Sequence, residues 1–196
     1  MHRVNVDAVR LLQRIAAGSG LPEVQIVGML GPRGDGYRPG AWDPVTGPDD
    51  AYRYHRDQVR ALVEAGADVI AAYTLNDAAE AQGIVRAARE AGIAVEISFT
   101  VETDGLLASG RTLAETIAEV EASDPPDGYA LNCAHPDHFE RALDADTAPR
   151  IVGIRPNASR LSHAELDESE ILDDGDPVEL ADRMACLLYT SPSPRD

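Results

Sequence analysis

One unit occurs twice in the sequence, and it constrains the fold more than any other feature. An amphipathic stretch ends in Glu-Ala-Gly at residues 64–66 and again at residues 90–92, and a short apolar run follows each, over 68–74 and 95–100. A glycine in that place favours the left-handed residue that closes a helix, and β-branched apolar runs are typical of strands buried on both faces. The alternation predicts an α/β fold with a parallel sheet.

The same rule, applied along the chain, predicts five strands and five helices. The expected strands cover residues 24–30, 68–73, 95–101, 128–133 and 150–155. The expected helices cover residues 6–17, 50–65, 77–91, 112–122 and 136–143. The first helix carries its apolar residues on one side, which predicts that it packs on the sheet. These residues are Val6, Val9, Leu11, Leu12 and Ile15.

Three residue pairs have the spacing at which two side chains cap the start of a helix reciprocally. The pairs are Asp77 with Glu80, Thr112 with Glu115 and Ser162 with Glu165. Each pair predicts that a helix begins directly after its first residue.

Every predicted strand is followed by glycine, proline, asparagine or a small hydroxyl residue. In a (β/α)8 barrel the active site lies at the carboxyl ends of the strands, where loops present polar groups over a packed interior. A doubly wound open sheet has a similar rhythm, but no glycine-rich dinucleotide loop follows any of these strands. We therefore expect part of a (β/α)8 TIM barrel with a functional rim.

The chain is shorter than a closed barrel requires, and its last residues differ in composition from the rest. A (β/α)8 barrel typically takes about 250 residues and eight strands, whereas this chain has 196 residues and five predicted strands. Residues 186–196, CLLYTSPSPRD, break the preceding composition and match one reading frame of a common sequencing-library adapter. We expect a partial barrel domain over 1–185 and a non-native tail over 186–196. A natural disordered Ser-Pro tail is the alternative.

Composition narrows the possible partners. Acidic residues outnumber basic ones by 34 to 17, and a net charge of −17 disfavours nucleic acids and anionic membranes. No apolar run approaches the roughly 20 residues of a membrane helix, the start is unlike a signal peptide, and two cysteines make no disulfide framework. A cytoplasmic location is expected, and the sequence does not indicate an oligomeric state.

The chain contains no lysine, so Schiff-base chemistry is excluded.

The densest group of metal-capable side chains lies at residues 131–138, LNCAHPDH. Its Cys-x-His-x-x-His spacing is not a common structural zinc signature, and a lone cysteine at a strand end is more often a small buried residue than a ligand. His135 and His138 flank the expected start of a helix, where a histidine that faces solvent is ordinary. Alternatively, the two histidines complete a metal site with Cys133.

Four segments resemble the homocysteine S-methyltransferase family in order and approximate spacing: GPRGDGYRPG at 31–40, DVIAAYTL at 68–75, ISFT at 97–100 and LNC at 131–133. The resemblance extends over about residues 5–184. It implies a (β/α)8 barrel in which the predicted strands are the third to the seventh, with the first, second and eighth missing.

The resemblance also implies chemistry. In that family three cysteines hold zinc, one after the sixth strand and a pair in a Gly-Gly-Cys-Cys segment after the eighth. Cys133 matches the first, and the pair has no counterpart. Zinc lowers the pKa of the homocysteine thiol, and the thiolate attacks the methyl group of a sulfonium donor, S-methylmethionine or S-adenosylmethionine, giving methionine. The implied partners are thus homocysteine and this donor, and no residue is assigned as a catalytic acid or base.

Strand-end residues are the candidates for substrate binding. Tyr73 stands where the family commonly has a glutamate that holds the amino group of homocysteine, and Glu102 near the mouth could attract the sulfonium. The polar candidates read equally well as turn or cap residues. Two alternatives remain for the function: an inactive fragment that lacks the complete zinc site, and a metal-free barrel enzyme. The substrate-binding candidates are Tyr73, Thr74, Ser98, Thr100, Asn132 and Asn157.

Overall fold

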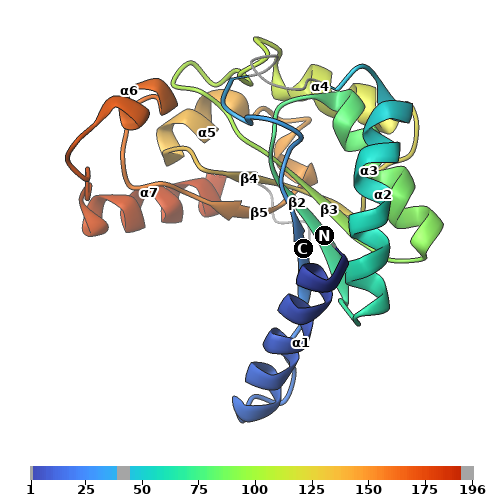
Figure 1. The fold of residues 1–196 in the computed structure, drawn as a ribbon. Coiled ribbons are helices and arrows are strands. Elements are labelled where there is room, and N and C mark those ends of the chain that lie inside the picture. Colours follow the sequence, from blue (N-terminus) through green and yellow to red (C-terminus); the bar gives the residue numbers. More distant parts are fainter. Residues whose placement is uncertain (1, 39–44, 191–196) are drawn as a thin grey trace.

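The computed structural model describes residues 2–38 and 45–190 and has one parallel sheet (Figure 1). All five predicted strands are present, and their order across the sheet follows their order in the chain. Each neighbouring pair is parallel, so every connection crosses back to the start of the next strand. The strands are β1 (Val27–Leu30), β2 (Val69–Leu75), β3 (Val95–Phe99), β4 (Gly128–Asn132) and β5 (Ile151–Arg155).

The five predicted helices are also present, and the described residues contain further ones. The predicted helices are α1 (His2–Gly18), α2 (Pro48–Glu64), α3 (Ala78–Ala91), α4 (Leu113–Glu121) and α5 (Pro136–Ala142). Beyond them lie a short 3-10 helix (Ala148–Arg150), α6 (His163–Glu168) and α7 (Pro177–Thr190).

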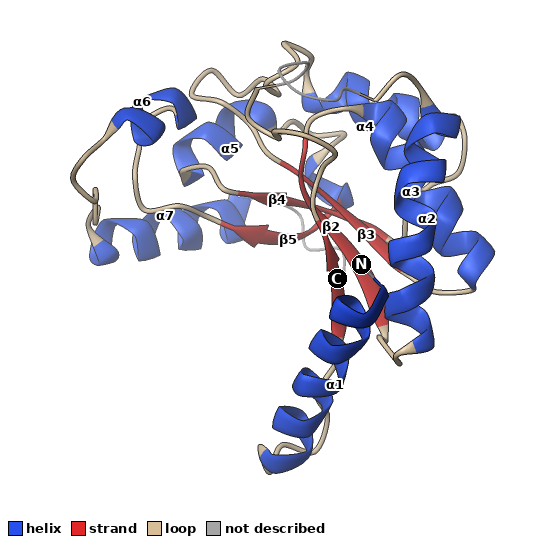
Figure 2. Cartoon of the chain, in the orientation of Figure 1, coloured by secondary structure: helices blue, strands red, loops and turns tan. Residues whose placement is uncertain are grey.

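Strand order and helix placement together give the wall of a barrel. A doubly wound sheet reverses its strand order at a switch point, whereas this order runs straight from β1 to β5. Figure 2 shows α2 and α3 side by side along one face of the sheet, and α2 packs on β1 while α3 packs on β2 and β3. The α/β fold with parallel strands is therefore confirmed.

The hydrophobic core lies between the sheet and these helices. Side chains alternate along each strand, so Ile97 and Phe99 face the helices while Ser98 faces the opposite side. Phe99 and Ile97 are fully buried. On β1, Gly28 lies so close to Leu62 of α2 that a β-carbon would meet its side chain at 3.2 Å. Small residues thus let the helices approach the strands closely.

The prediction that α1 packs on the sheet is wrong. The helix contacts mainly α2, and Figure 1 shows it projecting from the rest of the molecule. Val9 is buried at 2% exposure, but Leu12 and Ile15 remain 42% and 60% exposed. The Gln13 side chain fixes the contact by donating to the Ala65 carbonyl at 3.0 Å. Helical periodicity identifies an apolar side, but it does not say which neighbour covers that side.

The start of α7 was not predicted, and its last part runs into the predicted tail. Residues 186–190 continue the helix. Leu187 is buried in the core cluster, and α7 packs against α5. An amphipathic helix needs only suitably spaced apolar residues, so helical structure here says nothing about origin, and the non-native tail remains a prediction.

Two of the three capping pairs form as predicted. Thr112 with Glu115 and Ser162 with Glu165 make reciprocal caps at α4 and α6. At α3, Asp77 accepts from the Glu80 backbone amide, but the Glu80 side chain does not return the bond.

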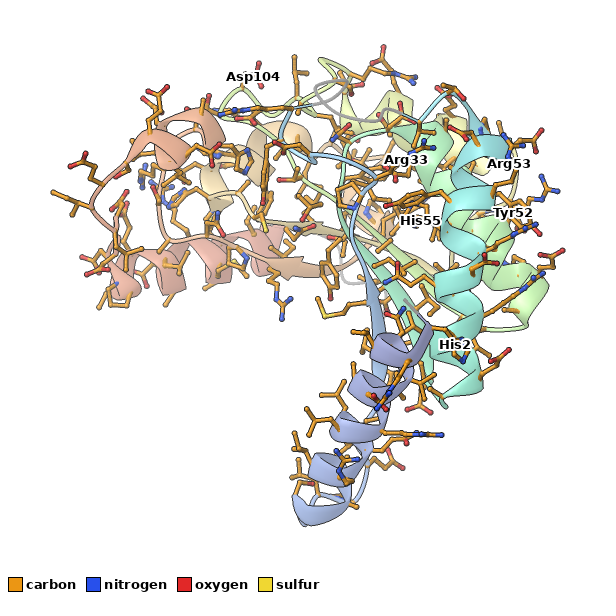
Figure 3. All side chains as sticks on the ribbon, viewed as in Figure 1. His2, Arg33, Tyr52, Arg53, His55 and Asp104 are labelled. Carbon is orange, nitrogen blue, oxygen red and sulfur yellow. The ribbon has the colours of Figure 1, made fainter. Side chains whose placement is uncertain are left out.

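The Glu80 carboxylate instead anchors a loop at the carboxyl edge of the sheet. Its Oε1 accepts from the Arg33 backbone amide at 2.6 Å and lies 2.7 Å from Nε2 of His55, and the side chains of Glu80 and His55 are almost fully buried. Figure 3 shows Arg33 and His55 near one end of α2. Because Glu80 joins α2, α3 and the loop after β1, it fixes where that loop lies over the strand ends.

Candidate functional site

Two of the predicted strand-end residues, Thr74 and Ser98, meet at the side chain of a third, Asn132, which is the last residue of β4. Asn132 Oδ1 accepts from the Thr74 backbone amide at 3.0 Å and from the Ser98 hydroxyl at 2.6 Å. Its Nδ2 donates to the Thr74 hydroxyl at 2.8 Å. Asn132 and Ser98 are buried. One amide therefore ties the ends of β2, β3 and β4 together.

Thr74 and Cys133 share an uncommon backbone conformation. Among the described residues they are the two non-glycine residues with positive φ, at 64° and 58°. For an L-residue other than glycine this left-handed region is disfavoured, and it persists where the surroundings fix it. The Thr74 hydroxyl lies 3.9 Å from the Cys133 thiol. The strained residues thus lie side by side at the rim.

Cys133 is held in this conformation through its backbone. Its amide donates to the Arg155 carbonyl at 3.0 Å, and its own carbonyl accepts from the Asn157 side chain at 3.1 Å. Nε2 of His163 donates to the same carbonyl at 2.6 Å, and Nδ1 of His163 lies 2.6 Å from the Glu102 carboxylate. Asn157 therefore belongs to the cluster. Glu102, which was expected to attract the sulfonium, contacts His163 instead.

A pocket of about 550 Å³ opens beside this cluster. Gly36 fits tightly there, because a β-carbon on it would lie 2.6 Å from the Thr74 carbonyl. The Asp35 carboxylate accepts from the Tyr37 amide at 2.9 Å and pairs with no basic side chain among the described residues. The pocket is lined by Pro32, Gly34, Asp35, Gly36, Tyr37 and Thr74.

Tyr37 connects the pocket to the thiol. Its ring packs on His163 with 4.1 Å between ring centroids. Burial raises the pKa of the Tyr37 phenol well above its ordinary value, and contact with the Cys133 thiol raises it further, so the hydroxyl stays protonated. The sequence had marked the 31–40 segment as a family motif without assigning a role to Tyr37 or Asp35.

Two predicted site residues lie apart from this cluster. Tyr73 packs against the guanidinium of Arg155, 5.3 Å from the ring centroid. Thr100 is buried, and its hydroxyl has no hydrogen-bond partner among the described residues. Neither lines the pocket. Their substrate-binding roles remain predictions.

One interpretation of the sequence expected His135 and His138 to face solvent, and that interpretation is wrong. Both are buried, and burial lowers the pKa of each imidazole. His135 Nδ1 accepts from the Asp137 amide at 3.2 Å and thereby caps α5. Because Nδ1 accepts this bond, the neutral ring carries its proton on Nε2, so neither nitrogen has a lone pair free for a metal in this arrangement.

The described residues do not form a complete metal site. No group of three or more histidine, cysteine or acidic side chains within 2–38 and 45–190 is arranged to hold an ion. Cys186 is exposed on α7. A catalytic zinc takes three protein ligands, and Cys133 is the one cysteine at the rim among the described residues.

Sequential parallel strands, helices on the outer face and a polar rim with a thiol at a strand end define a barrel-type α/β domain. The chain belongs to the homocysteine S-methyltransferase family, because the sequence model of that family matches residues 1–186. None of the curated proteins compared with the chain matches it.

Solved structures agree on the fold. The chain is similar to the homocysteine methyltransferase MmuM from Escherichia coli in its metallated form, with a TM-score of 0.66 and 21% identity over 81% of this chain and 59% of that one. The oxidized form of MmuM gives a TM-score of 0.72 and 21% identity over 98% and 64%. The apo form gives 0.58 and 18% over 84% and 70%. The chain thus spans 59% of the length of the metallated enzyme.

None of the helices described in the structure is both long enough and apolar enough to span a membrane.

Proposed function

We propose that the protein transfers a methyl group from a sulfonium donor to the thiol of homocysteine, giving methionine. Membership of the family supports this reaction. The observation that carries it is the Cys133 thiol, held in a left-handed conformation beside an open pocket at the carboxyl ends of the strands. A structural cysteine would not need a disfavoured backbone to reach the rim.

The strands present are proposed to be the third to the seventh of the family barrel. Their straight order and the position of Cys133 directly after β4 support this numbering, in which β4 is the sixth strand. The chain also matches only part of each MmuM chain.

The existence of a metallated form of MmuM supports a metal in the family reaction. In this chain Cys133 is proposed as one ligand, and zinc, when bound, would activate a thiol. The described residues do not fit a complete zinc site, so no step of the reaction is assigned to a metal held by this chain alone.

Substrate binding is proposed for the pocket beside Thr74. Asp35 supplies a carboxylate with no basic partner among the described residues, and Tyr37 supplies an aromatic face. A sulfonium or an ammonium group suits this pair, since a carboxylate and an aromatic ring both attract cations. Asn132 and Asn157 set the geometry of the pocket wall and of Cys133.

The reaction itself needs no base acting on the methyl group. The thiolate sulfur attacks the methyl carbon, the new carbon–sulfur bond forms as the donor's bond breaks, and the electron pair leaves with a neutral thioether. The main task of the site is therefore to hold the attacking sulfur, the methyl carbon and the leaving sulfur in one line.

A titration tests the proposed binding. The purified chain is followed by two-dimensional NMR while S-methylmethionine or S-adenosylmethionine is added. Shifts centred on Thr74, Asp35 and Tyr37 are expected. A folded chain whose pocket signals move with neither donor contradicts the proposal.

A second test concerns the gene. Genomic sequence beyond codon 185 is expected to encode a strand followed by a cysteine pair, which supplies the missing ligands. A continuing reading frame without such a pair overturns the assignment of Cys133.

A further inference from the structure

Cys133 needs external bonds to keep its conformation. A left-handed residue with a β-carbon costs roughly 1–2 kcal/mol relative to the right-handed region, and φ is 58° here. The strain is retained because the chain on both sides is fixed: the Cys133 amide bonds to β5, and its carbonyl accepts two side-chain donors.

The two donors to this carbonyl differ in how firmly they are held. Asn157 is near in sequence to β5 and donates at 3.1 Å. His163 is the first residue of α6 and donates at 2.6 Å, while its second nitrogen contacts Glu102 at 2.6 Å. The carbonyl oxygen can only accept, so Nε2 carries the proton in this contact. A carboxylate on the other nitrogen fixes the orientation of the ring, as it does for histidines that bind metals.

The same imidazole also supports the pocket. Tyr37 packs on the His163 ring with 4.1 Å between centroids, and the Tyr37 hydroxyl contacts the Cys133 thiol. His163 is mostly buried, with 11% of its side chain exposed. One side chain thus touches the backbone of Cys133 and the pocket wall that faces its thiol.

We propose that His163, oriented by Glu102, is a positioning residue that sets the direction of the Cys133 thiol relative to Tyr37 and the pocket. The importance of His163 for methyl transfer rests on the proposed function. Its effect on the direction of the Cys133 thiol is independent of that function. His163 is not among the described residues that line the pocket, and it acts through the carbonyl of Cys133.

Two amide substitutions separate this role from general packing. The side-chain nitrogen of glutamine lies where Nε2 of histidine lies, and that of asparagine lies where Nδ1 lies. His163→Gln therefore keeps a donor for the Cys133 carbonyl, and His163→Asn keeps only a group facing Glu102. Both variants remove the ring and its contact with Tyr37. Asparagine is one methylene shorter, so the comparison is made between variants with equal melting temperatures.

The readout is alkylation of Cys133 by iodoacetamide in the full chain with Cys186→Ser, which leaves one thiol. No metal or substrate is added. His163→Asn is expected to raise the rate about fivefold, the factor that corresponds to one net hydrogen bond, because the freed residue leaves its packed position beside Thr74. His163→Gln is expected to stay within about twofold of the parent rate.

Hydrogen exchange of the Cys133 amide gives a second measure if the thiol reacts too slowly in every variant. Faster exchange in His163→Asn than in His163→Gln, with equal melting temperatures, supports the proposal. Equal alkylation and exchange in the two variants overturns it. Failure of methyl-donor binding leaves these results unaffected, so the positioning role and the proposed function fail separately.

Discussion

The side chain of Asn132 bonds both the backbone amide and the hydroxyl of Thr74, so the end of β4 holds the end of β2 in its left-handed conformation. These two residues are 58 positions apart in sequence. The link passes over β3, whose Ser98 donates to the same amide oxygen. The rim is therefore a hydrogen-bonded unit rather than a set of independent loops.

Asn132→Ala is expected to destabilise the chain by about 2–3 kcal/mol, because it leaves the Thr74 amide and the buried Ser98 hydroxyl without their acceptor. Chemical denaturation measures the change. Ser98→Ala is the matched control, since it removes one of the bonds together with its donor and is expected to cost about 1 kcal/mol. Equal losses in both variants would show that Asn132 does not join the three strands.

Gly92→Ala tests the sequence signal that predicted the fold. Gly92 closes α3 at φ 71°, and a β-carbon there has open space around it, so any cost comes from the backbone. A loss of about 1 kcal/mol is expected by thermal or chemical denaturation. Gly18→Ala is the control, because Gly18 also has open space but no positive φ. A neutral Gly92→Ala variant would contradict this account.

The sequence predicted the fold where local chemistry decides it. The Glu-Ala-Gly units at 64–66 and 90–92 precede β2 and β3, and Gly92 adopts the expected left-handed cap. It failed for α1, because an apolar helix side is a local property and its partner is not. The predicted reciprocal cap between Asp77 and Glu80 failed for the same reason. The Glu80 carboxylate binds residues 25 and 47 positions away instead of the Asp77 amide.

The site was predicted in part. The polar residues at strand ends could be placed together, because parallel strands bring their carboxyl ends to one edge. Asp35 and Tyr37 were missed as site residues, since they lie on a loop whose course depends on tertiary contacts. His163 was missed because the place of α6 over the strand ends depends on such contacts too. His163 had one available signal: it directly follows the capping residue Ser162, which fixes where α6 begins.

Stability is expected to fall as the pH drops below about 6.5, the ordinary pKa of histidine. Burial lowers the pKa of His135 and His138 in the folded chain, so the unfolded chain binds more protons once the pH is under that value. The contribution is present above pH 6.5 and is lost progressively as the pH falls toward the lower folded pKa of each imidazole. Urea denaturation at several pH values between 7.5 and 5 measures it.

His138→Gln is expected to flatten this pH dependence, since it removes one of the two buried imidazoles. His2→Gln is the control, because the His2 side chain is 65% exposed. A slope that is unchanged in His138→Gln refutes the assignment to these histidines.

Asp35→Asn is expected to weaken binding of S-methylmethionine about fivefold, the loss of one partly screened charge contact. Asp104→Asn is a matched control, because Asp104 makes the same turn contact, accepting the amide two residues on, but does not line the pocket. Calorimetry compares the two. Trimethylsulfonium and L-methionine then show which cation Asp35 holds, and equal affinities in both variants would exclude Asp35 from the pocket's function.

Residues 1–196 alone are expected to bind zinc weakly. A single thiolate cannot replace the three protein ligands of a catalytic site, and Cys133 is the one cysteine at the rim among the described residues. His135 uses Nδ1 to cap α5 and then carries its proton on Nε2, so it would have to give up this cap to bind a metal. Competition with a colorimetric chelator measures the affinity, with Cys186→Ser to remove the exposed thiol. Tight stoichiometric zinc that is lost in Cys133→Ser would mean that His135 and His138 complete a site after rearranging, and the proposal of Cys133 as one of three family cysteines would then have to be abandoned.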